Sequence, residues 1–293
     1  MSTHTTSSPS PMTHGSGLQP GSGITFSRVL KSEWIKVTTV RSTVILIAST
    51  VVVMVALAAL SAWGYAQFAE AISDGNVPAN LQAQGPGSPA DEALTVPSSG
   101  LVFGQLLIAS LAVVLIASEW ATGMIRSTLV AVPGRTQALL AKTVIVSAVS
   151  FLVGLLSALV SYLIAQPILG GQNIDFALTE SGVLASIINT GTFLALVAVI
   201  SMSLGILLRN TAGGVVTAVG ILFVLPVIMQ LLSGLADWVS DAARFLPEEA
   251  GNQMVAVTAA DNALTQFQGG LVMGVWALAF LAAALIVTKK RDV

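Results

Sequence analysis

Six long apolar runs constrain this chain more than any other feature of its sequence. Each run is long enough for a helix to cross about 30 Å of hydrocarbon, which takes about 20 residues. A lipid-facing segment of this kind can satisfy its backbone hydrogen bonds only as a helix. The runs cover residues 42–64, 100–118, 143–166, 182–208, 213–234 and 269–288. We therefore predict an all-α integral membrane protein with six transmembrane helices over residues 42–293.

Composition supports this class and excludes several kinds of chemistry. Of the 293 residues, 54% are hydrophobic and only 9% are charged, whereas about a quarter of a soluble domain is charged. The chain has no cysteine, and its two histidines, His4 and His14, lie in a Ser/Thr/Pro/Gly-rich tail over residues 1–23 that we predict to be disordered. We expect no disulfide, no metal site and no histidine acid–base chemistry.

Residues 24–41 form the first structured segment, and their pattern is that of an amphipathic helix. Its apolar side carries Phe26, Val29, Leu30, Trp34 and Val37. Its polar side carries Arg28, Lys31, Ser32 and Lys36. We predict a basic helix that lies on the membrane surface, with Trp34 at headgroup level. The alternative is a juxtamembrane flank that is helical and has no further role.

The basic residues divide unequally between the two sides of a six-span arrangement. One side receives Arg28, Lys31, Lys36, Arg41, Arg126, Arg135, Lys142, Arg209, Lys289, Lys290 and Arg291. The other side receives Arg244 alone. Because short cytoplasmic loops carry the excess of Lys and Arg, we predict that both termini are cytoplasmic and that the protein is a multi-pass protein of the plasma membrane.

The middles of the six runs contain no ionisable residue, which disfavours an ion-coupled transporter. Their polar side chains are neutral, and some could line a path for an amphipathic substrate. We take as candidates Gln105, Tyr162, Asn189, Thr192 and Gln230. The alternative role for these side chains is hydrogen bonding between helices.

No pattern of a catalytic site occurs in the chain. There is no zinc-protease helix and no phosphate-binding Walker A sequence. We therefore expect a non-enzymatic subunit without a cofactor of its own. If ATP drives movement across the membrane, the ATPase must be a separate polypeptide.

A polar, basic segment separates the second and third runs. It reads EWATGMIRSTLVAVPGRTQALLAK over residues 119–142. This segment closely resembles the cytoplasmic loop of ABC-2 type transporter permeases, particularly actinobacterial ones. Two further stretches agree with the resemblance, RVLKSEWIKVTTVRS before the first run and FLPEEAGNQM before the last. Together with the six spans, the resemblance covers most of residues 24–293.

The resemblance implies a transmembrane subunit of an ATP-driven exporter. Such a subunit pairs with a second copy or a related permease and docks two ATP-binding subunits, which hold ATP and Mg²⁺. The segment before the first span would be a connecting helix, and the loop between spans two and three would supply a coupling helix. The residues in or beside that helix would be Glu119, Trp120, Thr122, Gly123, Met124 and Arg126. Arg135 and Lys142 would stand where the loop returns to the membrane.

The physical character of the loop permits two roles for Glu119. It can meet the partner, with Arg126 offering a bidentate contact to a partner carboxylate, or it can pair internally with Arg126 or Arg41 and hold the loop in shape. Other functions also remain open: a membrane anchor or sensor subunit that transports nothing, or an ion-coupled secondary transporter. The expected cargo is amphipathic or hydrophobic, such as a drug, a peptide antibiotic or a lipid-like molecule. Expected partners include membrane lipid but no nucleic acid.

Overall fold

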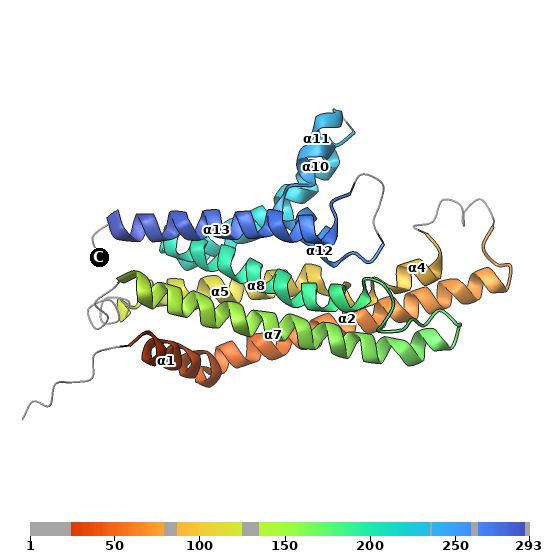
Figure 1. The fold of residues 1–293 in the computed structure, drawn as a ribbon, viewed down its shortest axis with the longest axis horizontal. Helices are drawn as coiled ribbons and strands as arrows, with labels where there is room; N and C mark the ends of the chain where they lie inside the picture. Colours follow the sequence, from red (N-terminus) through yellow and green to blue (C-terminus); the bar gives the residue numbers. More distant parts are fainter. Residues whose placement is uncertain (1–24, 79–86, 125–134, 235, 259–262, 291–293) are drawn as a thin grey trace, which may run out of the picture.

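The structure is a computed structural model that describes residues 25–78, 87–124, 135–234, 236–258 and 263–290. In these ranges every regular element is a helix. The predicted tail, residues 1–23, lies outside the described residues. Figure 1 shows a bundle of long helices that lie side by side along one axis.

The prediction of six membrane-spanning helices is confirmed, since six helices are long and apolar enough to cross a membrane. Five of them are α2 (Arg41–Ser73), α5 (Leu101–Ala121), α7 (Arg135–Gly170), α8 (Val183–Leu208) and α13 (Gln266–Lys290). The remaining span consists of three consecutive pieces, α9 (Thr211–Val219), the π-helical turn η2 (Gly220–Val224) and α10 (Leu225–Leu232). The shorter elements are α1 (Phe26–Thr39), α4 (Pro89–Ala93), η1 (Val96–Ser98), α11 (Asp237–Ala243) and α12 (Pro247–Val255).

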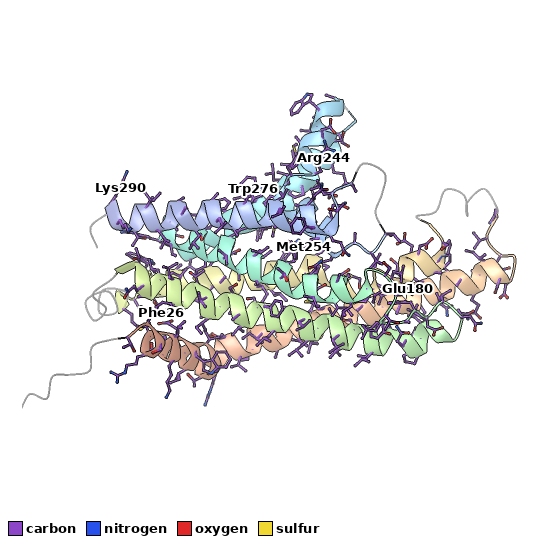
Figure 2. The ribbon with its side chains drawn as sticks, viewed as in Figure 1. Phe26, Glu180, Arg244, Met254, Trp276 and Lys290 are labelled. Atoms are coloured by element: carbon purple, nitrogen blue, oxygen red, sulfur yellow. The ribbon has the colours of Figure 1, made fainter. Side chains whose placement is uncertain are left out.

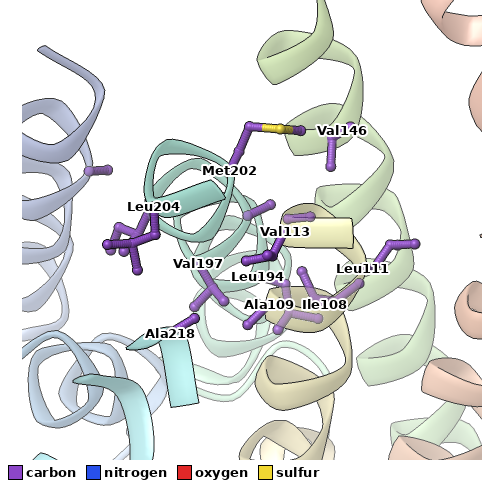
Figure 3. Close-up of a cluster of buried hydrophobic side chains, with 14 of the residues drawn as sticks. Ile108, Ala109, Leu111, Val113, Val146, Leu194, Val197, Met202, Leu204 and Ala218 are labelled. Carbon is purple, nitrogen blue, oxygen red and sulfur yellow. The ribbon is translucent and has the colours of Figure 1, made fainter. Parts of the chain in front are cut away.

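Helix α8 lies at the centre of the bundle, where it packs against α5, α7 and α13. Its contact with α7 is close because glycines face the partner helix on both sides: a Cβ on Gly154 would lie 2.8 Å from the Thr190 carbonyl oxygen, and one on Gly191 would lie 2.7 Å from that of Phe151. Figure 3 shows the apolar core that results, with Ile108 and Val113 of α5 beside Leu194 of α8. Dispersion contacts in this core replace the hydrophobic effect, which does not act between helices in lipid.

Helices α2 and α7 are longer than the apolar runs predict. With 33 residues, α2 is about 50 Å long, more than the hydrocarbon thickness requires. A second apolar cluster accompanies the added length: beyond the apolar runs, Leu169 of α7 is buried there with Ala93 of α4, and Tyr65 of α2 packs against this cluster. In Figure 1, α4 lies at the end of the bundle opposite α1, and α2 and α7 extend to it.

The fifth span leaves the bundle partway along its length. The π-helical turn η2 precedes α10, and none of the α10 residues is buried. In Figure 1, α10 and α11 project away from the other helices. The segment that follows α10 forms two helices, α11 and α12. They are separate because Pro247 begins α12 at the position where proline is best tolerated in a helix. The indole of Trp276 on α13 donates to the Phe245 carbonyl and ties this region to the bundle.

Helix α1 lies against the starts of α2 and α7. Figures 1 and 2 place it at the same end of the molecule as Lys290, with Glu180 at the other end, and we call this end the α1 end. The helix buries Val29, Glu33 and Val37. Phe26 and Trp34, which the sequence places on the same apolar side, remain 43% and 45% exposed. The helix therefore has one face for the bundle and a second apolar strip available to the membrane surface.

Candidate functional site

Helix α5 continues without a break into the segment that begins at Glu119. The Thr122 N–H and hydroxyl both reach the Ser118 carbonyl, so the helical pattern persists to Ala121. Gly123 then adopts a φ of +72°, a conformation that favours glycine, and ends the helix. Glu119 and Trp120 consequently belong to the last turn of the span, rather than to a separate helix beyond it.

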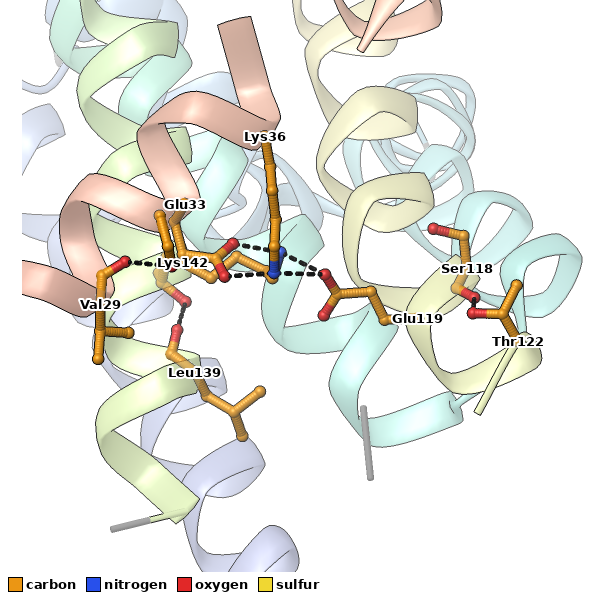
Figure 4. Close-up of polar contacts among 10 residues, drawn as sticks. Val29, Glu33, Lys36, Ser118, Glu119, Thr122, Leu139 and Lys142 are labelled. Carbon is orange, nitrogen blue, oxygen red and sulfur yellow. Dashed lines mark hydrogen bonds and ion pairs between the residues drawn. The ribbon is translucent and has the colours of Figure 1, made fainter. Parts of the chain in front are cut away.

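Four charged side chains form a buried ion network at the α1 end, and Figure 4 shows their alternating arrangement. Lys142 Nζ lies 2.9 Å from Glu119 Oε1 and 2.5 Å from Glu33 Oε2. Lys36 Nζ lies 2.7 Å from Glu33 Oε1 and 3.4 Å from Glu119 Oε1. Each lysine thus bridges both carboxylates. We call Glu33, Lys36, Glu119 and Lys142 the ion network.

The opposite charges within the network offset the free-energy cost of burying them. Glu33, Glu119 and Lys142 are only 2%, 3% and 4% exposed, and an unpaired charge at such a position costs several kcal/mol, of order 3–5 when a partner is removed. Burial acts to raise the pKa of Glu33, but Lys142 and Lys36 outweigh it and the pKa is lowered. Burial acts to lower the pKa of Lys36, but Glu33 and Glu119 outweigh it and the pKa is raised. Both groups are therefore charged at neutral pH.

Three helices supply the network. Glu33 and Lys36 come from α1, Glu119 from the end of α5 and Lys142 from the third turn of α7. The last two flank residues 125–134, so the network joins both ends of that segment to α1. Of the two roles predicted for Glu119, the geometry shows internal pairing, with Lys36 and Lys142 as partners. The partners expected from sequence were Arg41 and Arg126, and Arg126 lies outside the described residues.

Glu33 is a site residue that the sequence analysis missed. Its position follows from spacing, because Val29, Glu33 and Val37 recur every four residues and occupy one face of α1. A carboxylate in the middle of an apolar stripe signals a buried ion partner, since such a group is otherwise costly. Glu33 therefore belongs to the same side of α1 as Val29 and Val37.

Trp120 holds the end of α5 on another side. The Arg209 guanidinium carbon lies 4.0 Å from the Trp120 ring centroid, which is a close cation–π contact. Arg209 stands at the α8–α9 junction with a φ of +50°. Two consecutive residues of α5 therefore bind different parts of the bundle: Glu119 contacts α1 and α7, and Trp120 contacts the end of α8.

The remaining residues predicted for this site differ in accessibility. Thr122, Gly123 and Met124 are exposed, with Met124 at 45%. Arg135 is the first residue of α7. On α1, Arg28, Lys31 and Trp34 are exposed, and Lys36 is half-buried because it joins the network.

The structure does not gather the candidate substrate-path residues around one cavity. Tyr162 donates to the Phe176 carbonyl at 3.1 Å, and Asn189 donates to the Met254 carbonyl at 2.7 Å. Thr192 bonds back to its own helix at Ile188, and Gln105 is 1% exposed. For Tyr162 and Asn189 these contacts match the alternative role, in which polar groups hold segments of the fold together.

Gln230 differs from the other candidates because it lines a cavity. This cavity, of about 430 Å³, lies between α10, α11 and α12. Glu248 and Glu249 also line it. Burial and the neighbouring Glu249 raise the pKa of Glu248 in spite of a hydrogen bond from Asn252. Gln230 thus faces a cavity with mixed polar and apolar lining, and none of the other four candidates lines it.

Comparison with protein-family models, with curated proteins and with solved structures finds no match to this chain.

Proposed function

We propose that this membrane protein is the permease subunit of an ATP-driven exporter of the ABC-2 type. The observation that carries the proposal is the ion network, which joins both ends of residues 125–134 to helix α1. A segment that receives work from a soluble partner must be connected firmly to the spans it moves. The resemblance of residues 119–142 to permease loops and the lack of a Walker A sequence in this chain point the same way.

In this proposal, ATP-binding subunits dock at the α1 end, which is cytoplasmic. A displacement of residues 125–134 moves the end of α5 and the start of α7, and α1 moves with them because separating the buried charges is costly. Trp120 passes part of the displacement to α8 through Arg209. The spans would then rearrange as connected rigid elements, as in other packed helical proteins.

The exposures divide the proposed coupling residues into two groups. Glu119 is buried and acts as a positioning residue within the chain. Thr122, Gly123 and Met124 are exposed next to residues 125–134, so they are offered to the partner together with Arg126 and Arg135. The complete transporter contains two permease chains, identical or related, in the plasma membrane, and ATP and Mg²⁺ are held by two partner chains.

Co-purification with the candidate ATP-binding subunit tests this division. We expect Met124→Asp to weaken capture of the ATP-binding subunit and to leave the melting temperature of the chain unchanged, because the side chain is exposed. Trp238→Asp is the matched control, since Trp238 is 68% exposed on α11 and away from the α1 end. Capture by Met124→Asp that is as strong as capture by wild type and Trp238→Asp would exclude a docking role for this end.

Transport by reconstituted vesicles separates an exporter from a membrane anchor. With the ATP-binding subunit bound, an exporter moves an amphipathic probe only when ATP is supplied. A complex that binds and hydrolyses ATP without moving any amphipathic drug, peptide or lipid probe would identify an anchor or sensor instead. Movement driven by a proton or sodium gradient without ATP would identify a secondary transporter.

A further inference from the structure

A second cavity lies beside the ion network, and the function proposed above does not use it. It has a volume of about 350 Å³ and lies between the end of α1, the start of α2 and the last turns of α5. Cavities that bind small ligands in proteins range from about 300 to 1,000 Å³. Its apolar wall includes Leu46 of α2 and Leu111, Val114 and Leu115 of α5.

The accessible charge of this cavity is positive. Lys36, Glu119 and Lys142 all line it. The Lys36 side chain is 35% exposed, whereas those of Glu119 and Lys142 are 4% and 6% exposed. Glu119 Oε1 contacts both lysines, and its Oε2 is buried. Of the charged side chains that line the cavity, that of Lys36 is therefore the most accessible to a ligand.

The start of helix α2 adds to this positive character. Val40, Ser42 and Thr43 line the cavity, and no side chain caps this helix terminus. The first N–H groups of a helix have no acceptor within the helix and carry the positive end of its dipole. Such a terminus binds phosphate and carboxylate groups readily.

Thr43 is an independent sign that a polar partner belongs in the cavity. The residue is 2% exposed, and within the described part of the chain its hydroxyl makes no hydrogen bond. Most buried polar side chains have a partner. The other threonine of this part of α2, Thr50, bonds to its own helix at Leu46, which is the usual solution for a buried threonine in a span. Thr43 lines the cavity instead, where its hydroxyl could donate a hydrogen bond to a ligand oxygen.

The cavity also lies at a defined depth. Ser42 and Thr43 begin the first apolar run, directly after the basic helix α1. The polar part of the cavity is therefore at headgroup level, and the leucines of its wall extend toward the hydrocarbon. Lys36 retains its charge at neutral pH for the reason given for the ion network.

We propose that this cavity binds an anionic phospholipid, with the phosphate against Lys36, Thr43 and the first turn of α2, and with one acyl chain along Leu46, Leu111 and Leu115. A lipid fits better than a soluble anion because apolar side chains, among them Leu46, Leu111 and Leu115, form about half of the lining of the site. The proposal does not depend on transport, since it concerns binding by the single chain in any bilayer.

Binding of lipids of defined composition to the purified full chain tests the proposal. Phosphatidylglycerol and phosphatidylcholine with identical acyl chains are compared in nanodiscs or by native mass spectrometry, and inorganic phosphate is the third probe. We expect phosphatidylglycerol to bind about tenfold more tightly than phosphatidylcholine, because both offer a phosphate but the choline ammonium of the latter would lie near Lys36 and offset the attraction. Equal binding of the two lipids, or binding of inorganic phosphate as tight as that of phosphatidylglycerol, would overturn it.

Substitutions of residues that line the cavity test whether the lipid binds there. Leu115→Trp fills the apolar wall and Thr43→Val removes the hydroxyl at nearly constant volume, so both should reduce phosphatidylglycerol binding. Lys31→Gln removes an exposed lysine from the same helix α1 and should leave binding unchanged. Lys36→Arg should retain binding because it keeps the charge. If Thr43→Val and Leu115→Trp bind phosphatidylglycerol as wild type does, or if Lys31→Gln loses it, the lipid does not occupy this cavity.

Discussion

The Glu119 side chain is buried inside the bundle. Its Oε1 atom accepts from Lys142 at 2.9 Å and from Lys36 at 3.4 Å, while the side chain is almost inaccessible. A carboxylate in that position fixes how α5 sits relative to α1 and α7. Any contact with a partner protein must come from its exposed neighbours, beginning at Thr122.

Removal of one member of the ion network should cost more than removal of a matched pair. We expect Lys142→Met to destabilise the chain by about 3–5 kcal/mol because it leaves two buried carboxylates with one lysine. The double variant Glu119→Gln with Lys142→Met restores charge balance and should recover most of that loss. Unfolding of the purified chain in detergent measures both, and a double variant less stable than Lys142→Met alone would show that the network is not neutral as described.

The ion network should also set the pH range over which α1 stays docked. The lowered pKa of Glu33 means that its contribution is present above the unfolded value of about 4.3 and is lost as pH falls through the folded pKa. The raised pKa of Lys36 means that its contribution is present below about 10.4 and is lost as pH rises through the folded pKa.

The measurement is the difference in melting temperature between wild type and Glu33→Gln across this range. It should be constant from about pH 5 to 10, begin to shrink as pH falls below the unfolded value of about 4.3, where Glu33 of the unfolded chain is protonated, and disappear only below the lowered folded pKa. A difference that disappears between pH 6 and 8 would mean that Glu33 does not carry its charge in the folded state.

Sequence could mark Glu119 but not its partners. Glu119 directly follows the second apolar run, in the segment whose resemblance to permease loops marks it as a candidate. Its partner Lys142 is 23 positions away and Lys36 is 83 positions away. Which lysine meets which carboxylate depends on how each helix is rotated about its axis, and rotation follows from the packing of the whole bundle. Arg41 and Arg126 were equally reasonable partners by charge.

At the scale of elements, hydropathy predicted which helices exist better than where they end. Each apolar run became a helix because lipid leaves the backbone no alternative. The ends of α2 and α7 depend on neighbours, because Tyr65 of α2 and Leu169 of α7 still pack in the second apolar cluster beyond the ends of their apolar runs. The π-helical turn η2 also has no signal in apolar residues, since it changes the hydrogen bonding and not the composition.

The contact of α7 with α8 should tolerate no side chain at its glycines. In Gly191→Ala the new Cβ would lie 2.7 Å from a backbone oxygen, which cannot rotate away. The helices must separate, and we expect a loss of about 1–3 kcal/mol. Gly274→Ala on α13 is the control, because nothing lies within 4 Å of its Cβ position, and it should be neutral or stabilising by up to about 1 kcal/mol. Equal melting temperatures for the two variants would contradict this packing.

The Trp120 ring adds a cation–π contact with Arg209 to the packing of α5 against α8. Trp120→Leu keeps an apolar side chain and removes the surface under the Arg209 guanidinium, which should cost about 1–2 kcal/mol. In an Arg209→Gln background the same substitution should have a smaller effect, because the cation is already absent. A cost that is the same in both backgrounds would mean that Trp120 acts through packing alone.

At the scale of the whole molecule, the charges make a prediction about orientation. The α1 end holds α1, the end of α5 and the basic end of α13, and the positive-inside rule makes it cytoplasmic. Because the chain has no cysteine, Thr122→Cys at the α1 end and Ser88→Cys before α4 can each be labelled alone. A membrane-impermeant maleimide should reach position 88 from outside intact cells and position 122 only after permeabilisation. The reverse result would mean that the α1 end faces the outside of the cell.

The proposed exporter, assembled with its ATP-binding subunit, gives the most direct test of whether the ion network connects residues 125–134 to the spans. The charge-balanced double variant, Glu119→Gln with Lys142→Met, should fold, reach the membrane and bind the ATP-binding subunit, because the exposed residues of the loop are unchanged. ATP-driven transport in vesicles should nevertheless be lost, since the ends of α5 and α7 are no longer joined to α1 by buried charges. If this variant transports as wild type does while retaining the ATP-binding subunit, the ion network does not couple the loop to the spans.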